Sequence, residues 1–570
     1  MGAKLRLYRP MIDAGDTYWI LISSALVMLM TPAVGFFYGG MVRQKNVLAM
    51  MGQSLIILSL VSLQWMLFGY SLAFGKDLFG LIGNFDWTFL KGVGLDPNPD
   101  YAADIPHLAF AVFQCMFAAI TPALIIGAFA DRIKFESFLL FSFLWSCLVY
   151  DPVAHWIWAR GGWLREIGSL DFAGGTVVHI TAGASALAAA LIIGRRLGYG
   201  SEKMLPHAIP FTILGGALLW FGWFGFNAGS ALGDERLAVH AFLTTNLAAA
   251  AGALAWILTS RLQNQKPSVS GIMIGTVSGL VGITPACGYV SPLSAVMIGL
   301  IAGALCHAAM NLRGKSEIDD SLDVLACHGV GGIWGALATG LFAEEAINPA
   351  GANGLFFGNP GLLLTQLIAV LVVLLYSFVL TALLLYALKA TVGLRVTPRE
   401  EKQGLDLAVH GEEAYFMLPI GDEADTQSLH VLEGVKVGEV MNTKVRTVSP
   451  GDNLESVQDL MLEKQHFALP VLDDSRKVLG VITIKELRKV DHADRKHRSV
   501  NDIYLRQHEV AFPEETIHDL IERMQEKHIS NLPVIRSDGD RELIGIISKS
   551  DLITAYKRIV VSNLTAEVRN

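Results

Sequence analysis

Long stretches without charged residues are the feature that most constrains this chain. A helix needs about 20 apolar residues to cross a hydrocarbon core about 30 Å thick. The runs expected to cross are 17–42, 46–75, 105–130, 137–159 (interrupted only by Asp151), 172–194, 204–233, 237–260, 267–312 (long enough for two spans), 324–343 and 361–388. The sequence therefore predicts an all-α membrane bundle of eleven transmembrane helices.

Composition changes along the chain. Most of the 52 acidic residues lie from Glu400 onward, whereas all 11 tryptophans lie at or before Trp334. This contrast indicates a lipid environment for the first part and water for the second. We expect a membrane domain over 1–390, a cytoplasmic tail and linker over 391–434, and two soluble domains over 435–500 and 501–570.

Basic residues in the connecting loops predict the orientation. One set of loops holds eleven lysines and arginines, and the opposite set holds five. We expect a multi-pass protein of the cytoplasmic (inner) membrane, with the N-terminus outside and the C-terminal region in the cytoplasm. Asp13 and Asp16 stand where the apolar core of a signal peptide would begin, so no cleavable signal is expected.

The net charge and the cysteines limit the classes of partner, cross-link and metal site that we expect. The net charge of −8 and the lack of a long basic run argue against nucleic acid as a partner. The five cysteines all lie in apolar stretches and form no CxxC motif. We therefore expect neither disulfides nor a zinc site.

Two histidines stand out among the polar residues inside the predicted spans, where polar groups are costly. His179 is on the fifth span and His328 on the tenth. If spans 1–5 and 6–10 form an inverted 5+5 repeat, the two side chains meet near the midplane at the repeat interface. The simpler alternative is that each histidine bonds a neighbouring helix. Two in equivalent spans, each near an aspartate, favour a functional role, because imidazole donates, accepts and carries protons.

Three long motifs connect these spans to a known family. They are Phe37-Tyr-Gly-Gly-Met-Val-Arg-Gln-Lys-Asn46, Asp171-Phe-Ala-Gly-Gly-Thr-Val-Val-His179 and Gly222-Trp-Phe-Gly-Phe-Asn-Ala-Gly-Ser230. Over about residues 16–415 the chain closely resembles the Amt branch of the Amt/Rh ammonium transporters. The resemblance implies eleven spans, an external N-terminus, a homotrimer with one pore per subunit, ammonium or ammonia as the transported substrate, and no enzymatic activity.

The same resemblance implies which residues form the pore. Trp158, Phe117 and Ser230, with Phe113 as a neighbour, correspond to an outer cation site, where aromatic faces and a hydroxyl hold ammonium. Phe117 and Phe226 correspond to a stacked phenyl gate. His179 and His328 correspond to the twin histidines of the pore. Asp171 is expected to cap the fifth span and to lend negative potential to the entrance.

This arrangement implies a mechanism. Moving bare ammonium through a dry pore has a large desolvation cost. Deprotonation at the vestibule lets neutral ammonia cross, with the imidazoles as hydrogen-bond partners. The proton is either left outside, so that transport is neutral, or relayed separately, so that transport carries charge.

The C-terminal part contains an internal repeat at an offset of about 63 residues. Each copy is predicted to form a helix, a strand that contains Pro-Val, a turn, a strand that contains glycine, and a second helix. The second copy has a small insertion near Asp538–Asp540. The paired segments are Leu469–Val471 with Leu532–Val534, and Gly480–Glu486 with Gly545–Asp551. This pattern resembles a pair of α/β CBS domains.

The resemblance to CBS domains implies an adenine nucleotide (ATP, ADP or AMP) as a regulator, and no metal is expected. Thr483, Ser548 and Asp551 match the positions that bond ribose or phosphate, and Glu486 replaces the first aspartate. Lys549 and His528 are expected as phosphate neighbours. The alternative is that these hydroxyl and carboxyl groups only cap helices.

Three further interpretations remain open. Residues 404–415 resemble the tail on which PII signalling proteins act in relatives, so a PII-type partner is possible. An ammonium sensor that reports through its cytoplasmic domain is the main alternative, although no kinase or output motif is present. A membrane redox enzyme with both histidines as metal or haem ligands is another, although no carboxylate cluster or cysteine pair supports it.

Overall fold

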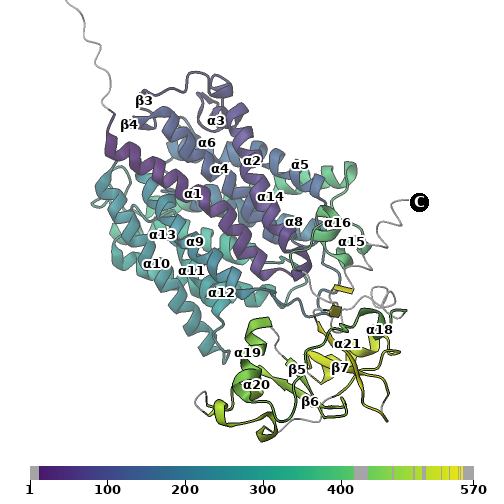
Figure 1. The fold of residues 1–570 in the computed structure, drawn as a ribbon. Coiled ribbons are helices and arrows are strands. Elements are labelled where there is room, and N and C mark those ends of the chain that lie inside the picture. Colours follow the sequence, from purple (N-terminus) through teal and green to yellow (C-terminus); the bar gives the residue numbers. More distant parts are fainter. Residues whose placement is uncertain are drawn as a thin grey trace, which may run out of the picture. The chain divides into compact units, whose positions relative to one another are not determined.

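The protein forms two units, Met1–Ala414 and Tyr415–Asn570 (Figure 1). The computed structural model describes residues 12–415, 434–464, 468–491, 494–503, 509–527, 529–537, 539–549, 551–552 and 554–555.

The first unit is a bundle of eleven long helical segments, as the sequence predicts. They are α1 (Ala14–Met41); α2 (Val47–Gln64) continued by η2 (Trp65–Gly69) and α3 (Tyr70–Phe74); α4 (His107–Phe129); α5 (Phe135–Trp145) continued by η4 (Ser146–Tyr150) and α6 (Asp151–Trp158); η5 (Gly175–Ile180) with α8 (Thr181–Ile193); α9 (Ile209–Ala228); α10 (Glu235–Leu262); α11 (Val269–Ile283); α12 (Pro292–Arg313); η7 (Leu325–Val330) with α13 (Gly331–Phe342); and α14 (Pro360–Thr391). Ten are long and apolar enough to cross a membrane, and α11 is a shorter apolar helix. The run 267–312 divides into two helices, as predicted.

Short elements connect these segments. They are η1 (Gln44–Asn46), β1 (Asp77–Leu78), β2 (Ile82–Gly83), η3 (Thr88–Leu90), β3 (Pro97–Asn98), β4 (Ala102–Pro106), α7 (Trp163–Glu166), η6 (Gly229–Ala231) and η8 (Leu355–Phe357). β1 pairs with β2 and β3 with β4, each antiparallel.

Glycines bring the fifth and tenth spans into backbone contact. A Cβ atom added at Gly183 would lie 2.2 Å from the Cα of Gly329, so any larger side chain would force the helices apart. A Cβ atom added at Gly175 would likewise clash, in this case with the ring of Pro285. This close approach places the two histidine-bearing segments side by side.

The tail that follows the last span folds back onto the membrane unit. It forms α15 (Pro398–Gln403) and α16 (Leu405–His410). The Asp406 carboxylate accepts the backbone N–H groups of Leu48 and Ala49 at 3.0 and 2.8 Å, and the Asn46 side chain accepts the N–H of Leu405 at 2.8 Å. The starts of α2 and α16 therefore cap each other.

The second unit contains two copies of one motif, as the internal repeat predicts. Its elements are α18 (Val437–Val440), α19 (Leu454–Lys464), β5 (Ala468–Leu472), β6 (Val478–Thr483), α20 (Ile484–Leu487), η9 (Arg495–His497), η10 (Val500–Asp502), α21 (Ile517–Glu526), β7 (Asn531–Ile535) and β8 (Leu543–Ser548). β5 pairs with β6 and β7 with β8, each antiparallel. The β7–β8 connection is longer than the β5–β6 connection, which is the predicted insertion.

Candidate pore and regulatory sites

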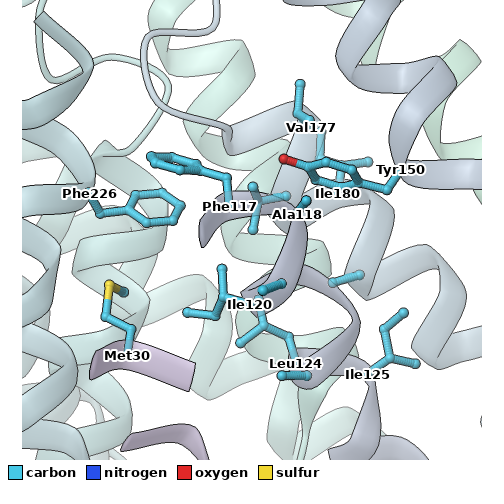
Figure 2. Close-up of a cluster of buried hydrophobic side chains, with 14 of the residues drawn as sticks. Met30, Phe117, Ala118, Ile120, Leu124, Ile125, Tyr150, Val177, Ile180 and Phe226 are labelled. Atoms are coloured by element: carbon cyan, nitrogen blue, oxygen red, sulfur yellow. The ribbon is translucent and has the colours of Figure 1, made fainter. Parts of the chain in front are cut away.

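Two phenyl rings from different spans stack inside the membrane unit. Phe117 on α4 and Phe226 on α9 are stacked, with ring centroids 4.1 Å apart and an interplanar angle of 26°. Both side chains are buried, and Figure 2 shows the two rings facing each other. Phe113 contacts Phe117 edge-on at 4.9 Å. The predicted gate residues therefore lie together, and no water-sized opening separates stacked rings at this distance.

The predicted outer site surrounds this gate. The Trp158 ring stands edge-on to Phe117, with centroids 6.0 Å apart, and its Nε1 donates to the backbone carbonyl of Asp171 at 2.9 Å. The Ser230 hydroxyl donates to the carbonyl of Phe226 at 2.9 Å. Because that bond uses the Ser230 proton, the lone pairs of its oxygen can accept a hydrogen bond from a cation.

The two histidines meet on the other side of the gate. Their Nδ1 atoms are 3.2 Å apart, so one must donate and the other accept. The His179 ring lies 6.1 Å from the Phe226 ring, nearly parallel to it, and 5.5 Å from Trp223. Among the residues that the structure describes, the buried Nε2 of His179 has no hydrogen-bond partner. This atom is therefore available to a small polar molecule.

A narrow cavity runs past these imidazoles. Its volume is about 20 Å³, close to the ~10–15 Å³ that one water needs, so it fits a single small molecule. Phe226 and both histidines line it, and Ile274, Leu322 and Asp323 also line it. The last three residues line a second, more polar cavity of about 350 Å³ as well. The two cavities therefore adjoin, and we call the larger one the polar vestibule.

Asp171 organises the start of the histidine-bearing fifth span. Its two carboxylate oxygens accept four backbone N–H groups, those of Gly174, Gly175, Thr176 and Val177, at 2.7–3.1 Å. The four N–H groups at a helix start have no partner within the helix, so this carboxylate satisfies all of them. The side chain is a helix cap in this structure.

Asp320 is the counterpart of Asp171 in the second repeat, and the sequence interpretation missed it. Asp320 precedes His328 by eight residues, as Asp171 precedes His179, and its carboxylate accepts the N–H of Leu325 at 2.8 Å. Asp323 lies nearer to His328 in the sequence, but it forms a two-bond ion pair with Arg313 at 2.8 and 3.1 Å. The equal spacing of eight residues was the available signal.

In the second unit, the predicted nucleotide-binding side chains pair with each other. The Ser548 hydroxyl donates to the Asp551 carboxylate at 2.6 Å, and Thr483 donates in the same way to Glu486. Burial raises the pKa of Glu486, but the hydrogen bonds from Thr483 outweigh this effect and hold the pKa below its usual value. The Lys549 backbone N–H donates to the carbonyl of Ser530. His528 lies outside the described residues.

Comparisons with known proteins identify both parts. The model of the Ammonium Transporter Family matches residues 18–415, and the CBS domain model matches 437–493 and 500–558. An ammonium transporter from Bacillus subtilis is 48% identical over 405 residues, covering 71% of this chain and 99% of that protein.

Solved structures give the same assignment. The crystal structure of Mep2 from Saccharomyces cerevisiae is similar with a TM-score of 0.64 and 36% identity, covering 68% of this chain and 89% of that one. A structure named Sensor Amt Protein matches with a TM-score of 0.65 and 32% identity, covering 69% and 98%. This chain therefore belongs to the ammonium transporter family and carries a pair of CBS domains after its membrane domain.

Proposed function

We propose that the chain conducts ammonium across the cytoplasmic membrane by passing it as neutral ammonia through the cavity beside His179 and His328. The observation that carries this proposal is the pair of imidazoles, with Nδ1 atoms 3.2 Å apart, in a cavity that fits one small molecule behind stacked phenyl rings. An ion in this space would lose nearly all of its hydration. Ammonia keeps hydrogen bonds to the imidazoles and has no charge to desolvate.

In this proposal each end of the passage has its own task. Trp158, Phe117 and Ser230 hold ammonium outside the gate by cation–π attraction and a hydroxyl acceptor. The substrate gives its proton to water before it passes the phenyl rings, and that proton is either left outside or relayed separately. The ammonia takes a proton from water in the polar vestibule beside the Arg313–Asp323 pair.

Ammonium uptake into proteoliposomes tests the conduction proposal. We expect His179→Ala and His328→Ala each to lower the rate about tenfold or more, because a buried polar molecule without a partner costs roughly 1–3 kcal/mol. His307→Ala is the matched control, since His307 is also buried within a span but bonds Ser260 and Asn311. Equal rates for the wild type and both pore variants would contradict the proposal.

We further propose that an adenine nucleotide on the CBS pair regulates the pore through the folded-back tail. The support is the mutual capping between α16 and the start of α2, which ties the tail to a transmembrane helix. The tail ends at the residues that lead into the CBS unit. A nucleotide that favours one arrangement of the pair shifts the pore by its difference in affinity for the two arrangements.

Isothermal titration of the full-length protein with ATP, ADP and AMP tests this regulation. We expect saturable binding of at least one nucleotide, and its loss in Asp551→Ala. Glu486→Ala is expected to change binding less, because the longer glutamate departs from the CBS pattern. A flat titration for all three nucleotides would reject regulation by nucleotides and leave the conduction proposal standing.

The family resemblance supports three further parts of the proposal, and the basic residues of the connecting loops also support the third. They are a homotrimer with one pore per subunit, contact between residues 404–415 and a PII-type protein, and an external N-terminus. The mass of the detergent-solubilised protein tests the trimer, and co-purification with a PII-type protein tests that contact.

A sensor that reports ammonium without transporting it is the second candidate. The observation that favours it is the similarity to the structure named Sensor Amt Protein. The uptake experiment separates the two functions, because a pure sensor binds ammonium but shows no uptake above that of empty vesicles.

A further inference from the structure

Arg165 holds the backbone of the residue that forms the outer cation site. It lies on α7, and its Nη1 donates to the carbonyl oxygen of Trp158 at 2.7 Å. Trp158 is the last residue of α6, so its carbonyl lacks a partner within that helix. A guanidinium at a helix C-terminus satisfies this carbonyl and interacts favourably with the helix dipole.

A second bond holds the ring of the same residue. The Trp158 Nε1 donates to the carbonyl of Asp171, and the ring stands at 87° to Phe117. The Arg165 bond fixes the backbone from which this ring projects. Together the two bonds determine which face Trp158 presents outside the gate.

Arg160 offers a natural comparison in the same loop. Its guanidinium forms an ion pair with Asp100 rather than a bond to Trp158, and its side chain is 72% exposed. Arg165 is also exposed. Replacing either arginine removes one positive charge from the outer mouth, but only the Arg165 change removes a bond to the cation site.

Arg165 has two opposing effects on ammonium. Its charge repels a cation, while its hydrogen bond fixes the ring on which cation–π attraction depends. Charges on the surface are largely screened beyond about 8 Å at physiological ionic strength. A direct hydrogen bond is not screened in this way, so added salt weakens the repulsion but leaves the positioning effect in place.

We infer that Arg165 is a positioning residue that sets the apparent affinity of the outer site by fixing Trp158. This inference rests on the proposed conduction function and its outer site. It adds a residue outside the predicted pore and assigns a large effect on affinity to Arg165 and a small one to Arg160.

Ammonium uptake kinetics of five variants, including Trp158→Leu alone, test the inference at physiological ionic strength. We expect Arg165→Gln to raise KM about fivefold without changing the maximal rate, as the loss of one hydrogen bond predicts. We expect Arg160→Gln to change KM less than about twofold, and Arg165→Lys to retain part of the wild-type affinity. In a Trp158→Leu background, Arg165→Gln is expected to have no further effect.

Three results would overturn the inference. One is an unchanged or lowered KM for Arg165→Gln, which would leave only the charge effect. Another is a full effect of Arg165→Gln on top of Trp158→Leu, which would mean that the arginine does not act through Trp158. The third is an unchanged KM for Trp158→Leu itself, which would also remove the outer site from the proposed function. The first two leave that function intact.

Discussion

Asp171 and Asp320 have the same task at the starts of two spans. Each is buried, precedes a histidine of the pair His179 and His328 by eight residues, and accepts backbone hydrogen bonds at the start of the histidine-bearing span. A helix start inside a membrane protein has no water to satisfy its N–H groups. The carboxylates therefore fix the start of each span, and with it the position of the imidazole that the span carries.

Replacing Asp171 should destabilise the membrane unit. Asp171→Ala leaves four buried N–H groups without a partner, and we expect it to lower the free energy of unfolding by about 2 kcal/mol or more. Asp171→Asn keeps one acceptor oxygen and should be affected less. Thermal unfolding of the detergent-purified protein measures this, with the exposed Asp96→Asn as a control. Equal melting of Asp171→Ala and the wild type would contradict the capping role.

The roles of some single residues could be predicted from the sequence, and those of others could not. Phe226 and His179 were recognisable because they stand in long motifs, and Phe117 and His328 through the family resemblance; the structure brings the four together. Arg165 was not recognisable as a partner of Trp158, because its role depends on how the loop after α6 folds back. Contacts made by exposed side chains across loops leave no periodic pattern in a sequence.

At the level of elements, the reciprocal cap between α2 and α16 joins segments more than 350 residues apart. Neither helix start is satisfied by its own side chains alone. Asp406 supplies acceptors to α2, and Asn46 supplies one to α16. Undocking the tail therefore exposes unsatisfied N–H groups on a transmembrane helix, which couples the position of the tail to the membrane unit.

Asp406→Ala should release the tail from α2. We expect faster amide hydrogen exchange at residues 47–49 and 405–410, because the capping bonds that protect both helix starts are lost. Glu412→Ala, at an exposed acidic residue of the same tail, is the matched control. If the two variants exchange at the same rate in both segments, the cap does not hold the tail.

Acid should weaken the loop between α12 and α13. Burial raises the pKa of Asp319, but hydrogen bonds from Arg196 outweigh this effect, so the pKa lies below its ordinary value of 3.8. At Asp319 the folded state therefore binds fewer protons than the unfolded state. The resulting stabilisation is fully present above pH 3.8 and is lost as the pH falls through the lower pKa of the folded state.

Asp319→Asn tests the buried ion pair between Asp319 and Arg196 directly. At neutral pH we expect it to cost about 3–5 kcal/mol, the usual cost of removing one partner from a buried pair. The difference from the wild type should shrink as the pH falls below 3.8. Unfolding curves in detergent across this pH range measure it, and a constant difference at all pH values would contradict the assignment.

For the whole molecule, the change of composition near residue 400 was sufficient to predict two units in two solvents. The eleven spans followed from charge-free runs and the CBS pair from an internal repeat, and both were confirmed. The docking of the tail could not be predicted, because it depends on single carboxylate–backbone contacts between distant segments. Such contacts have no local signature.

A truncation after Tyr415 should separate the two parts. The first unit ends at Ala414 and the match to the family model ends at residue 415, so we expect the shortened protein to retain ammonium uptake. Any response of uptake to an adenine nucleotide should disappear. Uptake in the presence and absence of nucleotide, compared between the full chain and the truncation, measures both effects, and a persistent response would place the nucleotide site in the membrane unit.

The central claim is that substrate crosses the histidine-lined cavity only after giving up its charge. Parallel flux of ammonium and potassium into the same proteoliposomes tests it most directly, because potassium carries the same charge but has no proton to release. The account predicts rapid ammonium uptake with potassium flux no higher than in empty vesicles. Potassium flux through the wild-type protein at a rate comparable to that of ammonium would contradict it.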